Sequence, residues 1–189
     1  MSHQKSALLL IDVQDSFFHR PYFSDADFPA FQTQLLKLID ACQTQAIPVV
    51  TVLHVTPEGP FSKASNWVKP MDFLPPLTGP VFEKTVHNAL IGSGLHEWLQ
   101  QQGITHLIIS GIRTEQCCET TTRVASDLGY VVDFVTEATL TFAMQHPNGN
   151  IYSAAEIKER TELVLNERFA KICSVDDIVR SFAVNAVAV

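Results

Sequence analysis

The chain has 189 residues, with 13 basic and 20 acidic side chains that give a formal net charge of −7 at pH 7. Apolar residues make up 46% and charged residues 17%, which is typical of a globular protein rather than a disordered one. The acidic balance, with no cluster of lysine or arginine, argues against nucleic acid or an anionic membrane as a partner. A chain of this length can bury a sizeable core, so we expect a single domain over residues 1–189.

Neither the apolar runs nor the cysteines point to a membrane or an oxidising compartment. No run approaches the length of a membrane span, and the apolar residues 7–11 are followed at once by Asp12. The four cysteines are too few for a disulfide framework, and their spacing matches no zinc site. We therefore expect a cytoplasmic protein.

Short apolar runs alternate with amphipathic stretches along the first half of the chain. The expected elements are a buried strand at 7–12, a helix at 31–46, a β-branched strand at 48–55, a strand at 81–84 and a helix at 93–102. Between the second and third strands lie residues 55–80, which hold six of the ten prolines. A long connection without periodicity is often functional, so we expect a lid over the site. The alternative is a fixed loop that buries Trp67 and Phe73 in the core.

The second half of the chain continues the alternation. The expected elements are a strand at 106–110, a helix at 114–128 ended by Gly129, a strand at 130–135, a helix at 153–169, a strand at 171–174 and a short helix at 174–182. Strands that are apolar throughout and alternate with helices favour a parallel sheet covered on both faces. The predicted fold is therefore α/β: a three-layer, Rossmann-like sandwich with a mostly parallel six-stranded sheet.

Three ionisable residues follow strand ends. Asp12 closes the first strand, Lys84 closes the third, and Cys117 lies just past the fourth, at the start of a helix. Each has an ordinary explanation: a turn residue, a solvated lysine, a core cysteine. In an open parallel sheet, however, ligands bind beyond the carboxyl ends of the strands, so all three are expected in one crevice.

These three side chains suit nucleophilic catalysis. The first turn of a helix offers unpaired N–H groups and a positive dipole end, and both of these, like a nearby lysine, favour a thiolate at Cys117. Asp12 would accept the thiol proton and Lys84 would hold the pair in place. Backbone N–H groups from Arg113 to Cys117 would stabilise an oxyanion.

The motifs "LLLIDVQDSF", "FEKTVHNAL" and "GIRTEQCCETTTRVASDLGY" resemble those of the isochorismatase-like cysteine hydrolase superfamily. The resemblance implies an Asp12–Lys84–Cys117 triad in which the nucleophile is the cysteine six residues after Gly111. It leaves Cys118 a packing role.

The resemblance also implies a non-proline cis peptide between Ile112 and Arg113, which would turn their backbone N–H groups toward the substrate. With Cys117 present, it favours hydrolysis of a C–N bond in an amide or ureide through a thioester. Vinyl-ether hydrolysis of the isochorismatase type and a non-catalytic binding protein remain open. Nicotinamidases of this superfamily bind a metal through an Asp and two His. Here Leu53 stands at the Asp position and His54 is alone, so we expect neither metal nor cofactor.

The remaining expectations concern the substrate and the assembly. Candidate pocket residues are Gln14, Phe17, His54, Phe61, Trp67, Arg113 and His146. The partner is expected to be a small-molecule substrate. The resemblance implies a homodimer or homotetramer, and the apolar C-terminal residues 181–189 are expected to pack on a partner subunit.

Overall fold

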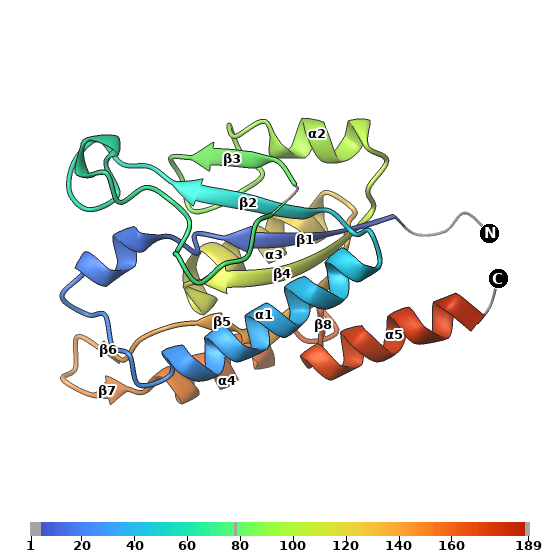
Figure 1. Cartoon of the computed structure of the whole chain (residues 1–189). Helices are drawn as coiled ribbons and strands as arrows, with labels where there is room; N and C mark the ends of the chain where they lie inside the picture. Colours follow the sequence, from blue (N-terminus) through green and yellow to red (C-terminus); the bar gives the residue numbers. More distant parts are fainter. Residues whose placement is uncertain (1–4, 78, 188–189) are drawn as a thin grey trace.

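A parallel six-stranded sheet forms the centre of the molecule, with the strand order β3-β2-β1-β4-β5-β8 (Figure 1). The structure is a computed structural model that describes residues 5–77 and 79–187. The strands of this sheet are β1 (Ser6–Ile11), β2 (Val49–His54), β3 (Val81–Lys84), β4 (His106–Ile112), β5 (Val131–Leu140) and β8 (Lys171–Ile172). Every neighbouring pair is parallel, as the alternation of strands and helices predicted.

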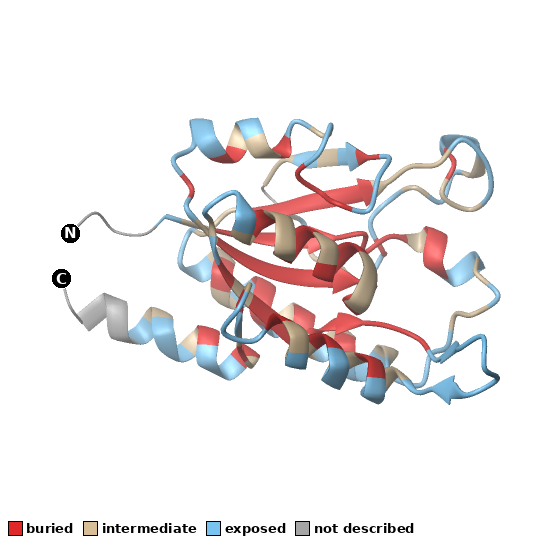
Figure 2. Cartoon of the chain, turned by 180° about the vertical axis from the view of Figure 1, so that it is seen from behind, coloured by how far each residue is buried: buried red, intermediate tan, exposed pale blue. Residues whose placement is uncertain are grey.

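Helices cover both faces of the sheet, which confirms the predicted α/β fold. They are α1 (Phe28–Thr44), α2 (Leu95–Gln101), α3 (Glu119–Asp127), α4 (Ala154–Leu165) and α5 (Val175–Val187). Apolar side chains of α1 and α5 pack on one face, and those of α2, α3 and α4 pack on the other. Figure 2 shows buried residues running along the strands and exposed ones on the outer sides of the helices.

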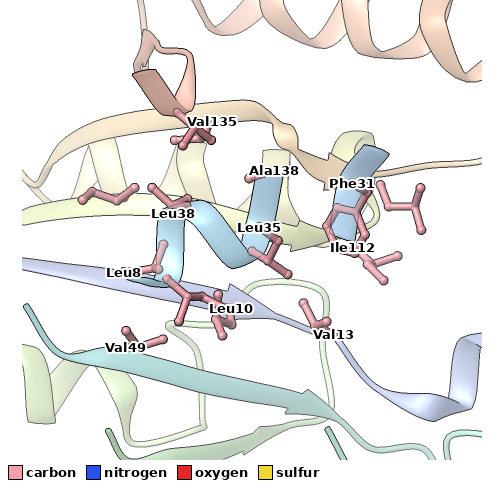
Figure 3. Packing of buried hydrophobic residues seen from close by; sticks show 14 of the residues in the cluster. Leu8, Leu10, Val13, Phe31, Leu35, Leu38, Val49, Ile112, Val135 and Ala138 are labelled. Atoms are coloured by element: carbon pink, nitrogen blue, oxygen red, sulfur yellow. The ribbon is translucent and has the colours of Figure 1, made fainter. Parts of the chain in front are cut away.

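The apolar run of β1 serves both faces because successive side chains of a strand point in opposite directions. Leu8 and Leu10 pack toward α1, where Leu35 and Leu38 lie about one helical turn apart (Figure 3). Ala7, Leu9 and Ile11 pack into the other cluster. Full burial of each large apolar side chain contributes roughly 1.5–3 kcal/mol, so a strand apolar throughout belongs at the centre.

The structure differs from the predicted elements after β4. Strand β5 runs on to Leu140 instead of ending near residue 135, and its pairing with β4 shifts register between Ile109 and Gly111. The helix expected from residue 114 begins as a separate π-helical turn, η3 (Thr114–Cys118). A two-stranded hairpin, β6 (Met144–Gln145) and β7 (Ile151–Tyr152), stands apart from the sheet. The η3 turn and the β6–β7 hairpin are too short to show an apolar periodicity from which they could be predicted.

The described residues of the 55–80 connection are anchored along the segment that follows β1. That segment includes a 3₁₀ turn, η1 (Asp15–His19), and the connection includes another, η2 (Lys63–Ser65). Backbone N–H groups of Asp15 and Ser16 donate to the carbonyls of Lys69 and Trp67, each at 3.0 Å. Met71 is buried and Phe73 packs against the core. The second half of the connection is therefore scaffold, whereas the lid role of the first half stays a prediction.

Two expectations concern the surface of the protein. Of the C-terminal stretch 181–189, residues 188 and 189 lie outside the described structure, and packing on a partner subunit stays a prediction. No helix within residues 5–77 and 79–187 is long and apolar enough to cross a membrane.

Gly111 offers a test of how closely β1 and β4 approach. A Cβ atom there would lie 2.0 Å from the carbonyl oxygen of Ile11, and the backbone φ is +127°. We expect Gly111→Ala to lower the free energy of unfolding by about 3 kcal/mol, because the clash with backbone adds to the strain of the positive φ. Gly103→Ala is the matched control, since Gly103 has φ +65° with no heavy atom within 4 Å of the added Cβ. Its expected cost is about 1 kcal/mol, measured by chemical denaturation. Equal costs for the two variants would contradict the prediction.

Candidate active site

The buried ammonium group of Lys84 joins the predicted site residues. Its Nζ lies 2.8 Å from Oδ2 of Asp12, 2.9 Å from Nδ1 of His54 and 3.4 Å from Sγ of Cys117. The Lys84 side chain is 0% exposed. A lysine ammonium has three N–H bonds, and here each of them has an acceptor. The structure thus brings Asp12, Lys84 and Cys117 together, as the sequence predicted.

The sheet topology accounts for this convergence. His54 and Lys84 are the last residues of the neighbouring strands β2 and β3, and they pair in register. Asp12 follows β1 directly with a left-handed φ of 54°, and its N–H donates to the carbonyl of Val52 at 2.8 Å. Cys117 follows β4 within η3. All four residues lie at the carboxyl edge of the sheet, where parallel α/β proteins bind ligands.

The turn that carries Cys117 has the backbone feature implied by the resemblance. The peptide bond between Ile112 and Arg113 is cis. The carbonyl of Arg113 accepts the N–H groups of Gln116 and Cys118, both at 3.2 Å. Those two N–H groups are therefore already engaged, and the expected oxyanion contacts of Ile112, Arg113 and Cys117 stay a prediction.

The electrostatics of the site correct one expectation. Burial raises the pKa of the Cys117 thiol, the negative charge of Asp12 raises it further, and Lys84 only partly opposes this. Burial also raises the pKa of Asp12, again against the lowering effect of Lys84. The expected thiolate is therefore not favoured in the resting site, because desolvation outweighs the lysine and the helix start. Cys117 therefore rests as a thiol, and a reaction at its sulfur would require loss of that proton.

His54 is a neutral partner of Lys84. Its pKa is lowered from 6.5 to about 4, first by burial and then by the positive charges of Lys84 and His87. Neutral imidazole has one nitrogen that can accept a hydrogen bond, and Nδ1 takes one from Lys84. Gln14 is buried and fixes this strand end: its Nε2 donates to the His54 carbonyl, and its Oε1 accepts the His54 N–H at 2.7 Å. Gln14 therefore positions His54 and is not one of the residues that line the cavity.

A cavity of about 320 Å³ opens above the triad. Of the predicted residues, Asp12, Phe17, His54, Phe61 and Cys117 line it. The prediction missed other lining residues: Arg20, Tyr22, Thr56, Glu58, Pro60, His87 and Gln116. His87 Nδ1 lies 3.7 Å from Cys117 Sγ. His87 lies three residues after Lys84, and Arg20 lies three residues after Phe17. This closeness to the recognised motifs is the sequence signal that could have indicated both as lining residues.

Three other pocket candidates do not line the cavity. Trp67 stacks on His19 with ring centroids 3.4 Å apart and remains 36% exposed. Arg113 is buried and forms an ion pair with Glu115 at 3.1 Å, because the chain turns its side chain into the protein. His146 is exposed in the turn between β6 and β7, and Tyr152 is the only described aromatic residue whose ring lies near its own.

The metal site of the nicotinamidases does not fit these residues. Leu53, at the position of the metal-binding Asp, is apolar and buried. Nδ1 of His54 is occupied by the Lys84 ammonium, which would repel a cation. Within the described ranges, no group of three or more His, Cys, Asp or Glu side chains could hold a metal ion.

The lowered pKa of His54 predicts a pH effect on stability. Between pH 6.5 and about 4 the unfolded chain binds a proton at His54 that the folded protein excludes, so stability falls as pH falls. We expect this to cost about 1–2 kcal/mol, after discounting for partial exposure. Denaturant unfolding at pH 7 and 4.5 should show a larger loss in the parent protein than in His54→Asn, which keeps an acceptor for Lys84. Equal losses in both would refute this origin.

Comparisons with known proteins place these features in a family. The sequence model of the isochorismatase domain matches residues 6–175. Nicotinamidase 3 of Arabidopsis thaliana is 30% identical over 95% of this chain and 90% of its own. Ureidoacrylate amidohydrolase RutB of Variovorax paradoxus is 28% identical over 94% of this chain and 81% of its own. The crystal structure of an isochorismatase from Pseudomonas putida superposes with a TM-score of 0.83 at 28% sequence identity. The superposition covers 91% of this chain and 89% of that one. The chain therefore belongs to the isochorismatase family, within the isochorismatase-like cysteine hydrolases.

Proposed function

We propose that this hydrolase cleaves a C–N bond of a small amide or ureide through a thioester on Cys117. The observation that carries the proposal is the position of Sγ in the cavity lining, 3.4 Å from the Lys84 ammonium. Oδ1 of Asp12 is buried without a hydrogen-bond partner among the described residues, so it can accept a proton. Two relatives named for amide chemistry, the nicotinamidase and the ureidoacrylate amidohydrolase, support the reaction class.

The reaction would proceed by proton transfer within the triad. Sγ attacks the substrate carbonyl carbon while its proton passes to Asp12, and the carbonyl oxygen takes the negative charge. The C–N bond then breaks, and the departing nitrogen takes the proton from Asp12. Water then attacks the thioester carbonyl and gives a proton to Asp12. The C–S bond breaks, and the departing sulfur takes that proton back from Asp12. Lys84 holds both acidic groups and offsets the charge that develops between them.

The cavity suits a small-molecule substrate. About 320 Å³ accommodates a small amide, and the lining combines aromatic rings with a few polar groups, as ligand sites usually do. Phe17 and Phe61 form one wall, with ring centroids 5.0 Å apart at nearly right angles. Phe61 belongs to the first half of the 55–80 connection, so this segment contributes directly to substrate selection.

The two adjacent cysteines provide the main test. Across a panel of small amides and ureides assayed by ammonia release, Cys117→Ala should lower kcat/KM by about 10³-fold or more, because the nucleophile is lost. Cys118 is fully buried against the sheet, so Cys118→Val is the matched control and should keep activity within about threefold. Activity that survives in Cys117→Ala, or is lost only in the Cys118 variant, would overturn the proposal.

The poor fit to a metal predicts the effect of chelation. Exhaustive treatment with a chelator, followed by metal analysis of the protein, should leave turnover of the best panel substrate unchanged, because Lys84 provides the positive charge beside the thiol. The control is the same protein with zinc or iron restored at one equivalent. Loss of turnover on chelation with recovery on addition of one metal would contradict this expectation.

A further inference from the structure

Arg20 contributes an uncompensated cation to the cavity lining. Its Nε is buried and, within the described part of the chain, has no hydrogen-bond acceptor. No ion pair of Arg20 is found among those same residues, whereas the guanidinium of Arg113 is paired with Glu115. Buried polar groups in folded proteins normally have partners, so an unpartnered donor in an arginine that lines a cavity is a sign of a ligand group.

The other charges of the cavity lining do not satisfy Arg20. Asp12 is paired with the Lys84 ammonium, and His54 is neutral at pH 7 because its pKa is lowered to about 4. Glu58 also lines the cavity, but it is an exposed residue and forms no salt bridge with Arg20. In a protein with a net charge of −7, an unpaired arginine in the same cavity lining as Cys117 makes the cavity locally favourable for an anion.

Local packing holds Arg20 at this position. Its backbone N–H donates to the carbonyl of Phe17 at 3.0 Å, which closes the η1 turn. Its guanidinium carbon lies 5.2 Å from the centre of the Tyr22 ring. Arg113 lies 4.9 Å from the centre of the same ring, so Tyr22 contacts two guanidinium groups. Such contacts stabilise a cation without consuming its N–H donors.

We propose that Arg20 binds a carboxylate of the substrate. The planar guanidinium presents parallel N–H donors that match a carboxylate in a two-bond contact. The preferred substrates are therefore amides or ureides with a carboxylate at the end remote from the scissile bond. The choice of scissile bond rests on the proposed function, whereas recognition of the carboxylate does not require turnover.

The test measures binding to the Cys117→Ala protein by calorimetric titration. Succinamate and glutaramate are the charged probes, and 4-methylpentanamide and 5-methylhexanamide are neutral probes of matched shape. We expect at least one charged probe to bind about tenfold or more tightly than its neutral match. When Arg20→Gln is added, the affinity of the charged probe should be within about threefold of the affinity of its neutral match. Arg20→Lys keeps the charge but loses the paired donors, so it should give an intermediate ratio.

Arg168→Gln is the matched control, because it removes one exposed positive charge outside the cavity lining and should leave the ratio unchanged. Absence of binding by all four probes, equal binding of charged and neutral probes, or a preference that persists in Arg20→Gln would each overturn the inference. If Arg20→Gln fails to fold by circular dichroism, a full charged-probe preference in Arg20→Lys would also overturn it. Failure of the proposed function would be distinct: the protein with Cys117 would release no ammonia while the titration still showed the preference.

Discussion

The site depends on a lysine ammonium that has been removed from water. A charged group in a protein interior costs several kcal/mol unless its hydrogen bonds are satisfied. Lys84 meets this requirement with a carboxylate, an imidazole and a thiol, each presented by a different strand end or turn. Since β3, β2, β1 and β4 are neighbours in the sheet, strand pairing alone brings these acceptors to one point. The strand order that defines the fold therefore also places the acceptors of Lys84.

The same burial governs the reactivity of the thiol. Desolvation raises the pKa of Cys117, so the thiol keeps its proton at rest, and the Asp12 carboxylate stays paired with the Lys84 ammonium. A nucleophile of this kind becomes reactive only when a substrate carbonyl is close enough for attack and proton transfer to occur together. This arrangement would protect the thiol from adventitious electrophiles and would make catalysis depend on the free oxygen of Asp12.

The residues around Lys84 and the walls of the cavity come largely from different parts of the chain. Asp12 and Lys84 lie at strand ends and Cys117 in the η3 turn, whereas much of the cavity wall comes from the turn after β1 and the first half of the 55–80 connection. The second half of that connection is bonded along residues 13–16 and is part of the scaffold. Arg20 and Phe61 line the cavity but take no part in the hydrogen bonds around Lys84.

The sequence by itself determined the parallel α/β fold and the meeting of Asp12, Lys84 and Cys117, because apolar periodicity places strands and strand ends share an edge. The resemblance to the family implied the cis bond after Ile112, which the structure contains, and its choice of Cys117 over Cys118 as nucleophile stays a prediction. Only the tertiary structure decided the direction of the thiol pKa, since desolvation depends on everything that surrounds the group. It also decided which side chains line the cavity. Arg20 and His87 do, while Trp67 and His146 do not, because a cavity wall is made by segments distant in sequence whose side-chain directions no local pattern encodes.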